Sequence, residues 1–351
     1  MAQKKLKILK KTKVLLLFLV AFIFSTPYLS AQIQDTDNLA LERIFSEAEK
    51  ITSLRSIIIQ QDGKHLGESY FNGRSANKPF NIKSASKSII GLLVGIAVEE
   101  GFIPSIEEPI ITYFPEYFEE NPDPEKEQIT IRNLLTMQAG LASTSSGNYG
   151  AWVLSKNWIE YTLDQDFVSE IDGRMVYSTG TSHLLSVIIA RASGMNTKRF
   201  AENYFFDPLG ITVGGWDRDP QGNYMGGNNL ALKPSDMLKI GQMLIDDGKY
   251  NGQQIIEMDW IIDSFKTYTY SNYNPYGYGY HWWNKKTGNY TTLFAWGHGG
   301  QYIMMIPELN SVVIMTSSVT NESRRRTYKR PVFALLEDHI IPFLESRKEI
   351  N

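Results

Sequence analysis

The feature that most constrains the fold is the distribution of strand and helix patterns, with strands at both ends of the chain and helices between them. Residues 53–72, SLRSIIIQQDGKHLGESYFN, place β-branched and aromatic residues on both sides of an Asp-Gly pair, which predicts a β-hairpin. Strand patterns return in YGYGYHWW, TTLFAWGHGGQYIMMIP and NSVVIMTSS. A last helix is expected in VFALLEDHIIPFLES, with Pro342 kinking it or delaying its start.

The middle of the chain is expected to be helical. SIIGLLVGIAVEE, residues 88–100, predicts a buried helix that ends at Gly101. Further helices are predicted in ITIRNLLTMQAG, SHLLSVIIARASG, KRFAENYFF and PSDMLKIGQMLIDDG. We therefore predict an α+β class, in which both chain ends build a sheet that helices cover. We expect a sheet lobe, about residues 45–95 plus 255–351, and a helical lobe, about residues 96–254, with a cleft between them.

The first residues have the pattern of a signal peptide. The charged stretch MAQKKLKILKKTK precedes the apolar stretch VLLLFLVAFIF, and small and polar residues follow around YLSAQ. We expect residues 1–31 to be removed after Ala31, which leaves residues 32–351 as a single exported domain, periplasmic or secreted, without a stable membrane span. The alternative is an uncleaved membrane anchor.

Composition excludes several classes of function. Loss of the first 31 residues moves the formal net charge from −3 to −9, and no basic face is left that could bind nucleic acid. Cysteine is absent, which excludes disulfides, thiolate metal sites and a cysteine nucleophile. The histidines show no ligand spacing such as HExxH, so no metal or other cofactor is implied. The G-x-S-x-G elbow of α/β-hydrolases is missing as well.

The most informative short motif is SASK, in which Ser84 and Lys87 lie three positions apart at the start of the apolar helix. If the helix begins near Ser84, the Lys87 amine lies one turn later on the same face, and backbone N–H groups can stabilise an oxyanion. For the motif alone, the alternative stays open that Ser84 caps the helix and Lys87 is a solvated charge. A second match, SANK at Ser75 to Lys78, precedes Pro79 and is interpreted as a loop.

Two further motifs follow in order. VYSTG places Tyr177 just before a helix, and WGHGGQYIMMIPELNSVVIM places His298, Gly299 and Gly300 at the start of a strand. Together with SASK they resemble the three active-site elements of the serine β-lactamase and penicillin-binding protein superfamily. Over about residues 50–345 the chain is most similar to the class C-like branch. That branch includes class C β-lactamases, D-aminopeptidase-like and D,D-peptidase-like enzymes, esterases and 6-aminohexanoate-dimer hydrolases.

The resemblance implies a β-lactamase/transpeptidase-like fold with an antiparallel sheet, and a role for each motif residue. Ser84 would be the acylated nucleophile, Lys87 its proton acceptor, and Tyr177 a second base or proton relay. The backbone N–H groups of Ser84 and Gln301 would form the oxyanion hole. This chemistry needs all of these groups, because a serine hydroxyl is a weak nucleophile until a neighbouring base takes its proton. A lysine can be that base only if its pKa falls.

The substrate-binding motifs depart from those of β-lactamases. His298-Gly299-Gly300 stands where they have Lys-Thr-Gly, and Thr179 stands where they usually have the asparagine that holds the substrate amide. A literal KTG, which begins at Lys286, is interpreted as a hairpin turn with a solvated lysine. We therefore predict a serine hydrolase, carboxylesterase or amidase-like, that acts through an acyl-enzyme on small-molecule esters, amides or peptides and hydrolyses β-lactams slowly or not at all.

Other functions are compatible with the same motifs. A D-amino-acid or cell-wall peptidase, a weak β-lactamase, and a non-catalytic penicillin-recognising binding protein are the alternatives. His281, within the aromatic segment 276–283, is interpreted as core rather than pocket lining. Tyr149, in the polar segment STSSGNYGAW, is a candidate for the rim of the cleft, although such segments are usually only loops. The remaining histidines lie singly in strand or helix patterns: His65, His183 and His339.

Overall fold

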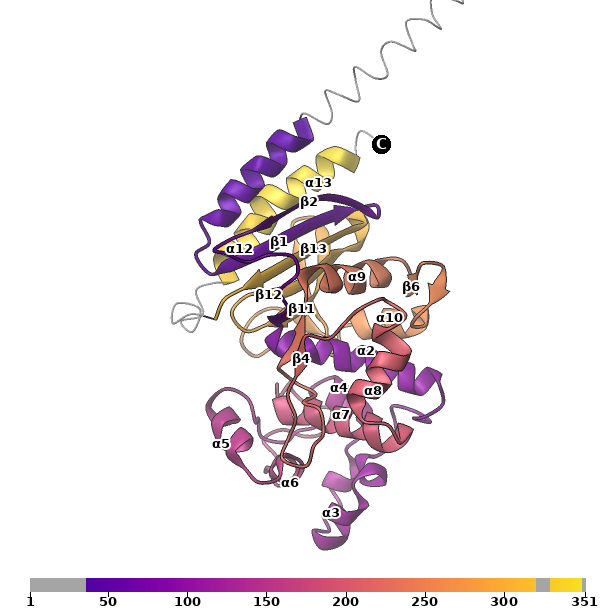
Figure 1. The fold of residues 1–351 in the computed structure, drawn as a ribbon. Helices are drawn as coiled ribbons and strands as arrows, with labels where there is room; N and C mark the ends of the chain where they lie inside the picture. The colour runs from indigo at the N-terminus through magenta and orange to yellow at the C-terminus, as the bar shows by residue number, and fades with distance from the viewer. Residues whose placement is uncertain (1–35, 320–328, 349–351) are drawn as a thin grey trace, which may run out of the picture.

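The computed structural model describes residues 36–319 and 329–348, and Figure 1 shows a sheet with helices packed against it. Within these residues the main sheet has eight strands in the order β2-β1-β13-β12-β11-β10-β9-β8, and all neighbours are antiparallel. The strands are β1 Leu54–Gln61, β2 Lys64–Tyr70, β8 Thr269–Tyr270, β9 Gly277–Tyr278, β10 Trp283–Thr287, β11 Tyr290–Gly297, β12 Gln301–Ile306 and β13 Ser311–Ser317. Because β1 pairs with β13, both chain ends build one sheet, and the predicted α+β class is confirmed.

The predicted hairpin is formed by β1 and β2. Asp62 and Gly63 at its turn have φ angles of 51° and 69°, the left-handed conformation that two-residue hairpin turns favour. The side chains of β1 alternate between two cores. Ile57 and Ile59 pack in the core that includes the first helix, residues 36–49, whereas Ile58 packs in the core on the opposite face.

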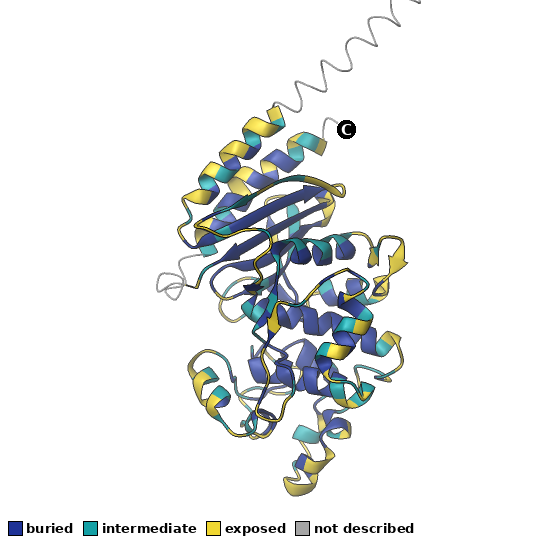
Figure 2. Ribbon diagram, viewed as in Figure 1, coloured by how far each residue is buried: buried dark blue, intermediate teal, exposed yellow. Residues whose placement is uncertain are grey.

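Helices cover both faces of the sheet. The first helix and the C-terminal helices lie on one face, and α9, Pro234–Ile245, packs against β13 on the other. A Cβ atom on Gly241 of α9 would lie 2.5 Å from Val312 Cγ1, so glycine at this position lets the helix approach the strand closely. Figure 2 shows the result, with the central strands β1, β12 and β13 buried and the outer side of the first helix exposed. The central parts of these strands are therefore nearly continuous apolar runs, whereas the edge strand β2 is polar and partly exposed.

The C-terminal helix is interrupted where Pro342 predicted a kink. It consists of α12 Lys329–Leu335, a π-helical turn η7 Leu336–Ile340, and α13 Ile341–Lys348. Pro342 is the second residue of α13, and it has no N–H group to donate to the preceding turn. The π-helical turn η7 ends directly before α13, and its wider turn accommodates the backbone where Pro342 cannot donate a hydrogen bond.

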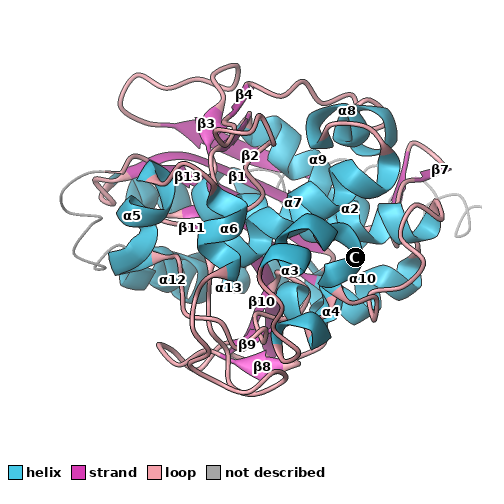
Figure 3. Cartoon of the chain, turned by 90° about the horizontal axis from the view of Figure 1, so that it is seen from below, coloured by secondary structure: helices cyan, strands magenta, loops and turns pink. Residues whose placement is uncertain are grey.

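The segments between β2 and β8 contain most of the helices, as predicted, and Figure 3 shows them gathered on one side of the sheet. The α-helices are α2 Ser86–Glu99, α3 Pro115–Glu120, α4 Ile131–Leu135, α5 Tyr149–Leu154, α6 Trp158–Leu163, α7 Thr179–Ser193, α8 Thr197–Ala201, α9 and α10 Met258–Phe265. Short helical turns are η1 Lys83–Ala85, η2 Ile110–Tyr113, η3 Lys126–Gln128, η4 Ser146–Asn148, η5 Glu202–Phe206 and η6 Pro307–Leu309. Small sheets are formed by β3 Phe80–Asn81, β5 Leu230–Leu232 and β4 Gly215–Trp216, and by β6 Lys249–Tyr250 and β7 Gln253–Gln254.

Several predicted boundaries were wrong. Helix α2 begins at Ser86, two residues earlier than the apolar run suggested, and only Ile131–Leu135 of the segment 129–140 is α-helical. The aromatic segment 276–283 contributes only Gly277–Tyr278 as β9 and the first residue of β10. Between β9 and β10 the chain turns, and His281 in this turn has a left-handed φ of 64°. The division into a sheet lobe and a helical lobe stays a prediction.

The predicted signal peptide, residues 1–31, lies outside the described residues. Among residues 36–319 and 329–348, no helix has the length and apolar character that crossing a bilayer requires.

Candidate active site

Ser84 lies in the tight turn that connects β3 to α2. Lys83 in this turn has a left-handed φ of 55°, and its backbone N–H donates to Asn81 Oδ1 at 2.9 Å. The Ser86 hydroxyl donates to the Lys83 carbonyl at 2.6 Å. Ser84 is therefore held in a 3-10 turn before α2 and remains partly exposed, whereas the sequence suggested a place in the first turn of the α-helix.

Lys87 is buried beside Ser84. The side chain of Lys87 is among the largest fully buried ones, at 1% exposure, and its Nζ lies 3.4 Å from Ser84 Oγ. The alternative that Lys87 is a solvated charge is therefore wrong. The capping alternative is also wrong, because the N-cap of α2 is Ala85. The second motif, SANK, is an exposed loop as predicted.

Burial lowers the pKa of Lys87 from its ordinary 10.5 to about 7, so the neutral amine and the ammonium are both populated near neutral pH. Nζ donates to the Gly227 carbonyl at 2.6 Å and to Thr179 Oγ1 at 3.2 Å. A neutral amine has two N–H groups and one lone pair. With both N–H groups taken by these acceptors, the lone pair is left for the third neighbour, the Ser84 hydroxyl.

Gly227 was not singled out by the sequence. A Cβ atom at this position would lie 2.7 Å from the Thr179 carbonyl oxygen and 3.1 Å from Lys87 Nζ. The glycine therefore lets its own carbonyl reach the amine. The Gly-Gly pair in GGNNLAL indicates that the backbone packs closely here. A sequence pattern cannot identify the Gly227 carbonyl as a hydrogen-bond acceptor for Lys87, because every residue has a backbone carbonyl.

Tyr177 and Thr179 enter the site from the start of α7. The Tyr177 ring lies against the Lys87 amine, with Nζ 4.9 Å from the ring centroid, and it stacks on Trp283 at 5.8 Å between centroids. Thr179 Oγ1 accepts a hydrogen bond from Lys87 Nζ and also lies 2.8 Å from Ser145 Oγ. Because its oxygen accepts from Lys87, the Thr179 hydroxyl can donate to Ser145. The structure thus brings the first two predicted motifs together.

The third motif lies in the turn between β11 and β12. His298, Gly299 and Gly300 precede the strand, which begins at Gln301, so their predicted place at the start of a strand was wrong by three residues. Gly299 and Gly300 have φ angles of 89° and 106°, which favour glycine at both positions. A literal Lys-Thr-Gly would place a β-branched residue at the first of them.

The end of β11 lies against the turn that holds Ser84. A Cβ atom on Gly297 would lie 2.0 Å from the Ile82 carbonyl oxygen, so only glycine allows this approach. Gln301 follows at the start of β12, and its buried side-chain amide exchanges two hydrogen bonds with the Ser317 backbone, at 2.6 and 3.1 Å. This contact fixes β12 to β13 next to η1. The oxyanion hole of Ser84 and Gln301 N–H groups stays a prediction.

His281 is a core residue beside the site. It is 1% exposed, and its Nδ1 lies 2.8 Å from the Leu135 carbonyl, so Nδ1 carries the proton and donates. Burial and the nearby charge of Lys87 lower the pKa of His281 to about 3, so the ring is neutral. Its interpretation as core is confirmed.

Two further candidates from the sequence, Tyr149 and Lys286, lie in different parts of the molecule. Tyr149 begins α5, and its hydroxyl accepts from Asn228 Nδ2 at 3.0 Å, next to Gly227. Lys286 is exposed in the β10–β11 hairpin, as predicted. Within residues 36–319 and 329–348 we find no cluster of three His, Asp or Glu side chains that could hold a metal ion.

The sheet and the buried lysine beside Ser84 define a fold of the β-lactamase/transpeptidase type. The family model Beta-lactamase matches residues 42–336, and the chain belongs to this family of hydrolases. The Bacillus subtilis (strain 168) protein named penicillin-binding protein PbpX is 22% identical, with 86% of this chain and 78% of the relative covered. The 6-aminohexanoate-dimer hydrolase of Paenarthrobacter ureafaciens is 20% identical, with 76% and 73% covered. The structure of EstCE1, a hydrolase with promiscuous acyltransferase activity, has a TM-score of 0.71 at 16% identity, with 86% and 99% covered.

Proposed function

We propose that the protein is an exported serine hydrolase that forms an acyl-enzyme on Ser84 and acts on short-chain esters, with small amides as the second substrate class. The observation that carries this proposal is the burial of Lys87 at 3.4 Å from the Ser84 hydroxyl, with two acceptors for its N–H groups. A purely structural lysine gains nothing from this arrangement, because burial of an amine that is not ion-paired costs free energy.

The reaction begins when the Lys87 lone pair takes the Ser84 proton. Ser84 Oγ then attacks the substrate carbonyl, and the N–H groups of Ser84 and Gln301 stabilise the tetrahedral oxyanion. The proton passes from the Lys87 ammonium, directly or through the Tyr177 hydroxyl, to the leaving group as its bond to carbon breaks. Water then attacks the acyl-enzyme with the same groups acting in reverse, which releases the acid and restores Ser84.

The substrate preference follows from the residues at two motif positions. His298 takes the place of a lysine, and an imidazole side chain does not offer the permanent positive charge of an ammonium for a β-lactam carboxylate. The Thr179 hydroxyl already forms hydrogen bonds with Lys87 and Ser145. Threonine also lacks the carboxamide with which an asparagine would hold a substrate amide. The machinery for attack on an activated carbonyl needs neither, which favours simple acyl substrates over β-lactams.

The test is the hydrolysis of p-nitrophenyl butyrate by three proteins. Wild type should turn over the ester, and Ser84→Ala should lose the activity while its thermal unfolding is unchanged. Ser75→Ala, which alters the exposed second copy of the motif, should behave as wild type. Activity that survives in Ser84→Ala would contradict the proposal, and inactivity of the folded wild type toward all esters would favour the non-catalytic binding protein instead.

A further inference from the structure

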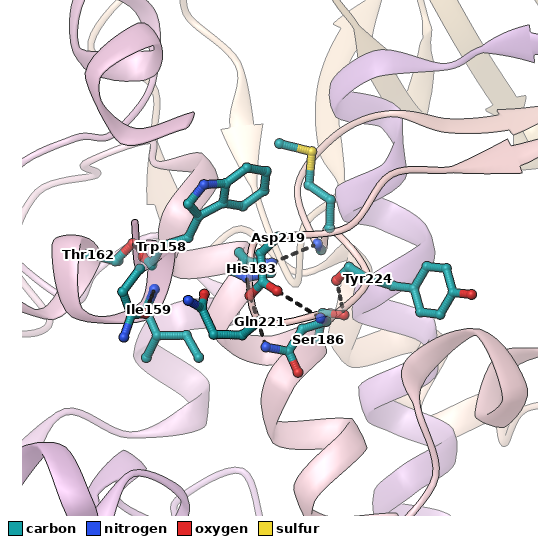
Figure 4. A network of polar contacts seen from close by, with 12 residues as sticks. Trp158, Ile159, Thr162, His183, Ser186, Asp219, Gln221 and Tyr224 are labelled. Atoms are coloured by element: carbon teal, nitrogen blue, oxygen red, sulfur yellow. Dashed lines mark hydrogen bonds and ion pairs between the residues drawn. The ribbon is translucent and has the colours of Figure 1, made fainter. Parts of the chain in front are cut away.

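A buried His-Asp pair lies one helical turn beyond the site on α7. The side chains of His183 and Asp219 are both fully buried, and His183 Nε2 lies 2.9 Å from Asp219 Oδ2. Figure 4 shows this pair at the centre of a network of polar contacts. The sequence suggested only a single histidine within a helix. None of the catalytic steps above uses the pair, although burial of a charge is costly unless the fold gains something from it.

The contacts of the pair fix the proton on one ring nitrogen. The Gly226 backbone N–H donates to His183 Nδ1 over 3.4 Å, so Nδ1 must present its lone pair. The proton is then on Nε2, which donates to Asp219. Asp219 also accepts from the Asn223 backbone N–H at 2.7 Å and from Asn223 Nδ2 at 2.8 Å. Burial alone would raise the pKa of Asp219, but the hydrogen bonds from His183 and Asn223 outweigh it and lower the pKa.

The loop that His183 holds leads directly to Lys87. Gly226 is followed by Gly227, whose carbonyl accepts from Lys87 Nζ at 2.6 Å. A Cβ atom on Gly226 would lie 2.1 Å from the Ser182 carbonyl oxygen, so the glycine pair lies directly on α7. Since Thr179 and His183 are four residues apart, they lie on the same face of that helix. One helix face therefore contacts both Lys87 and the peptide that Lys87 binds.

We infer that His183 and Asp219 are positioning residues for the proposed reaction: they hold the Gly226–Gly227 peptide so that the Gly227 carbonyl faces the Lys87 amine. This inference rests on the proposed function, in which Lys87 is the base. If the peptide turns away, one N–H group of the neutral amine loses its acceptor, and the lone pair is no longer directed at Ser84. The ammonium form loses the same acceptor, so Lys87 becomes easier to deprotonate.

Two substitutions at His183 separate positioning from packing. In His183→Gln the side-chain amide nitrogen reaches about where Nε2 stood, so the bond to Asp219 is retained and the acceptor for Gly226 is lost. In His183→Asn the side-chain oxygen lies about where Nδ1 stood, so the acceptor for Gly226 is retained and the bond to Asp219 is lost. Both variants remove the ring from its edge contacts with Trp152 and Trp158, at 5.9 and 5.4 Å between centroids. Both variants thus lose the same ring contacts, and asparagine, one methylene shorter, leaves the larger cavity, so a role in packing alone predicts the larger loss for His183→Asn.

The readout is the pH profile of p-nitrophenyl butyrate hydrolysis. We expect kcat of His183→Gln to fall on the order of 10²-fold, as for a misplaced catalytic group, with KM little changed. The acid limb of its kcat/KM profile should move to lower pH. His183→Asn keeps the acceptor for Gly226 but loses the Asp219 bond that orients it, so it should lose less activity and move the acid limb less than His183→Gln. Equal losses in both variants, or a larger loss in His183→Asn, with an unmoved limb would overturn the inference and leave a packing role.

A milder variant covers the case in which neither His183 substitution folds. Asn223 is half-buried, and Asn223→Ala removes one of the donors to Asp219. It should shift the acid limb in the same direction by a smaller amount, and an unmoved limb in folded Asn223→Ala would overturn the inference. The two proposals fail differently: an inactive wild type refutes the proposed function, whereas an active wild type with unaffected variants refutes only the positioning role.

Discussion

Replacement of Lys87 by methionine tests whether the buried amine titrates as the mechanism requires. Burial lowers the pKa of Lys87 from 10.5 to about 7, whereas in the unfolded chain the amine keeps its ordinary value. Between pH 7 and pH 10.5 the unfolded state therefore binds more protons than the native state. The free energy of unfolding of the wild type must rise with pH across this window, and this gain is lost as the pH falls toward 7.

The size of this effect follows from the shift. Between pH 6 and pH 9 the titration of Lys87 changes the free energy of unfolding by about 3 kcal/mol, because one pKa unit corresponds to about 1.4 kcal/mol. Methionine has a similar volume and no proton to lose. We therefore expect Lys87→Met to gain about 3 kcal/mol in stability relative to wild type when the pH falls from 9 to 6.

Urea unfolding at four pH values between 6 and 9 measures this difference. Lys286→Met is the matched control, because Lys286 is exposed in the β10–β11 hairpin, and its stability should run parallel to wild type. If the curves of Lys87→Met and wild type are parallel as well, the native pKa of Lys87 is unshifted. An unshifted lysine would be charged at neutral pH and could not act as the base.

Three further predictions concern substrate, packing and export. Wild type should have a higher kcat/KM for p-nitrophenyl butyrate than for nitrocefin, and His298→Lys should reduce the ratio of the two values. A preference of wild type for nitrocefin of more than about tenfold, or about 1.4 kcal/mol in transition-state binding, would contradict the argument from His298 and Thr179. Gly297→Ala should lower kcat sharply, because its Cβ would lie 2.0 Å from the Ile82 carbonyl oxygen. Gly150→Ala is the control and should keep the wild-type kcat, because no atom lies within 4 Å of its new Cβ. Equal kcat values in the two variants would show that a shift of η1 does not affect catalysis. N-terminal sequencing of the exported protein should begin near Gln32, and recovery only in membranes with residues 14–24 retained would contradict cleavage.

The parts of the site that depend on local spacing could be predicted from the sequence. Ser84 and Lys87 are three residues apart across the 3-10 turn that leads into α2, so helical spacing places them on the same side. The turn residues Asp62 and Gly63 likewise specify the hairpin by their own conformational preferences. Tyr177 required the resemblance to a known family, because nothing local connects it to Lys87.

The parts that depend on long-range packing could not be predicted. Gly227 is 140 residues from Lys87 and contributes a backbone carbonyl, which every residue has. His183 and Asp219 are 36 residues apart, and only the path of the loop before β5 brings them together. The third motif illustrates the same limit, because the register of β11 and β12 decides that His298 lies in the turn rather than in the strand.

The most direct test of the central claim is the site of acylation. Brief exposure to p-nitrophenyl butyrate, followed by acid quenching, peptide digestion and mass spectrometry, should find one butyryl group on the peptide that contains Ser84. Ser75→Ala should give the same adduct and Ser84→Ala none. An adduct on any other residue, or an unmodified protein after exposure to both the ester and a fluorophosphonate probe, would contradict the assignment of Ser84 as the nucleophile.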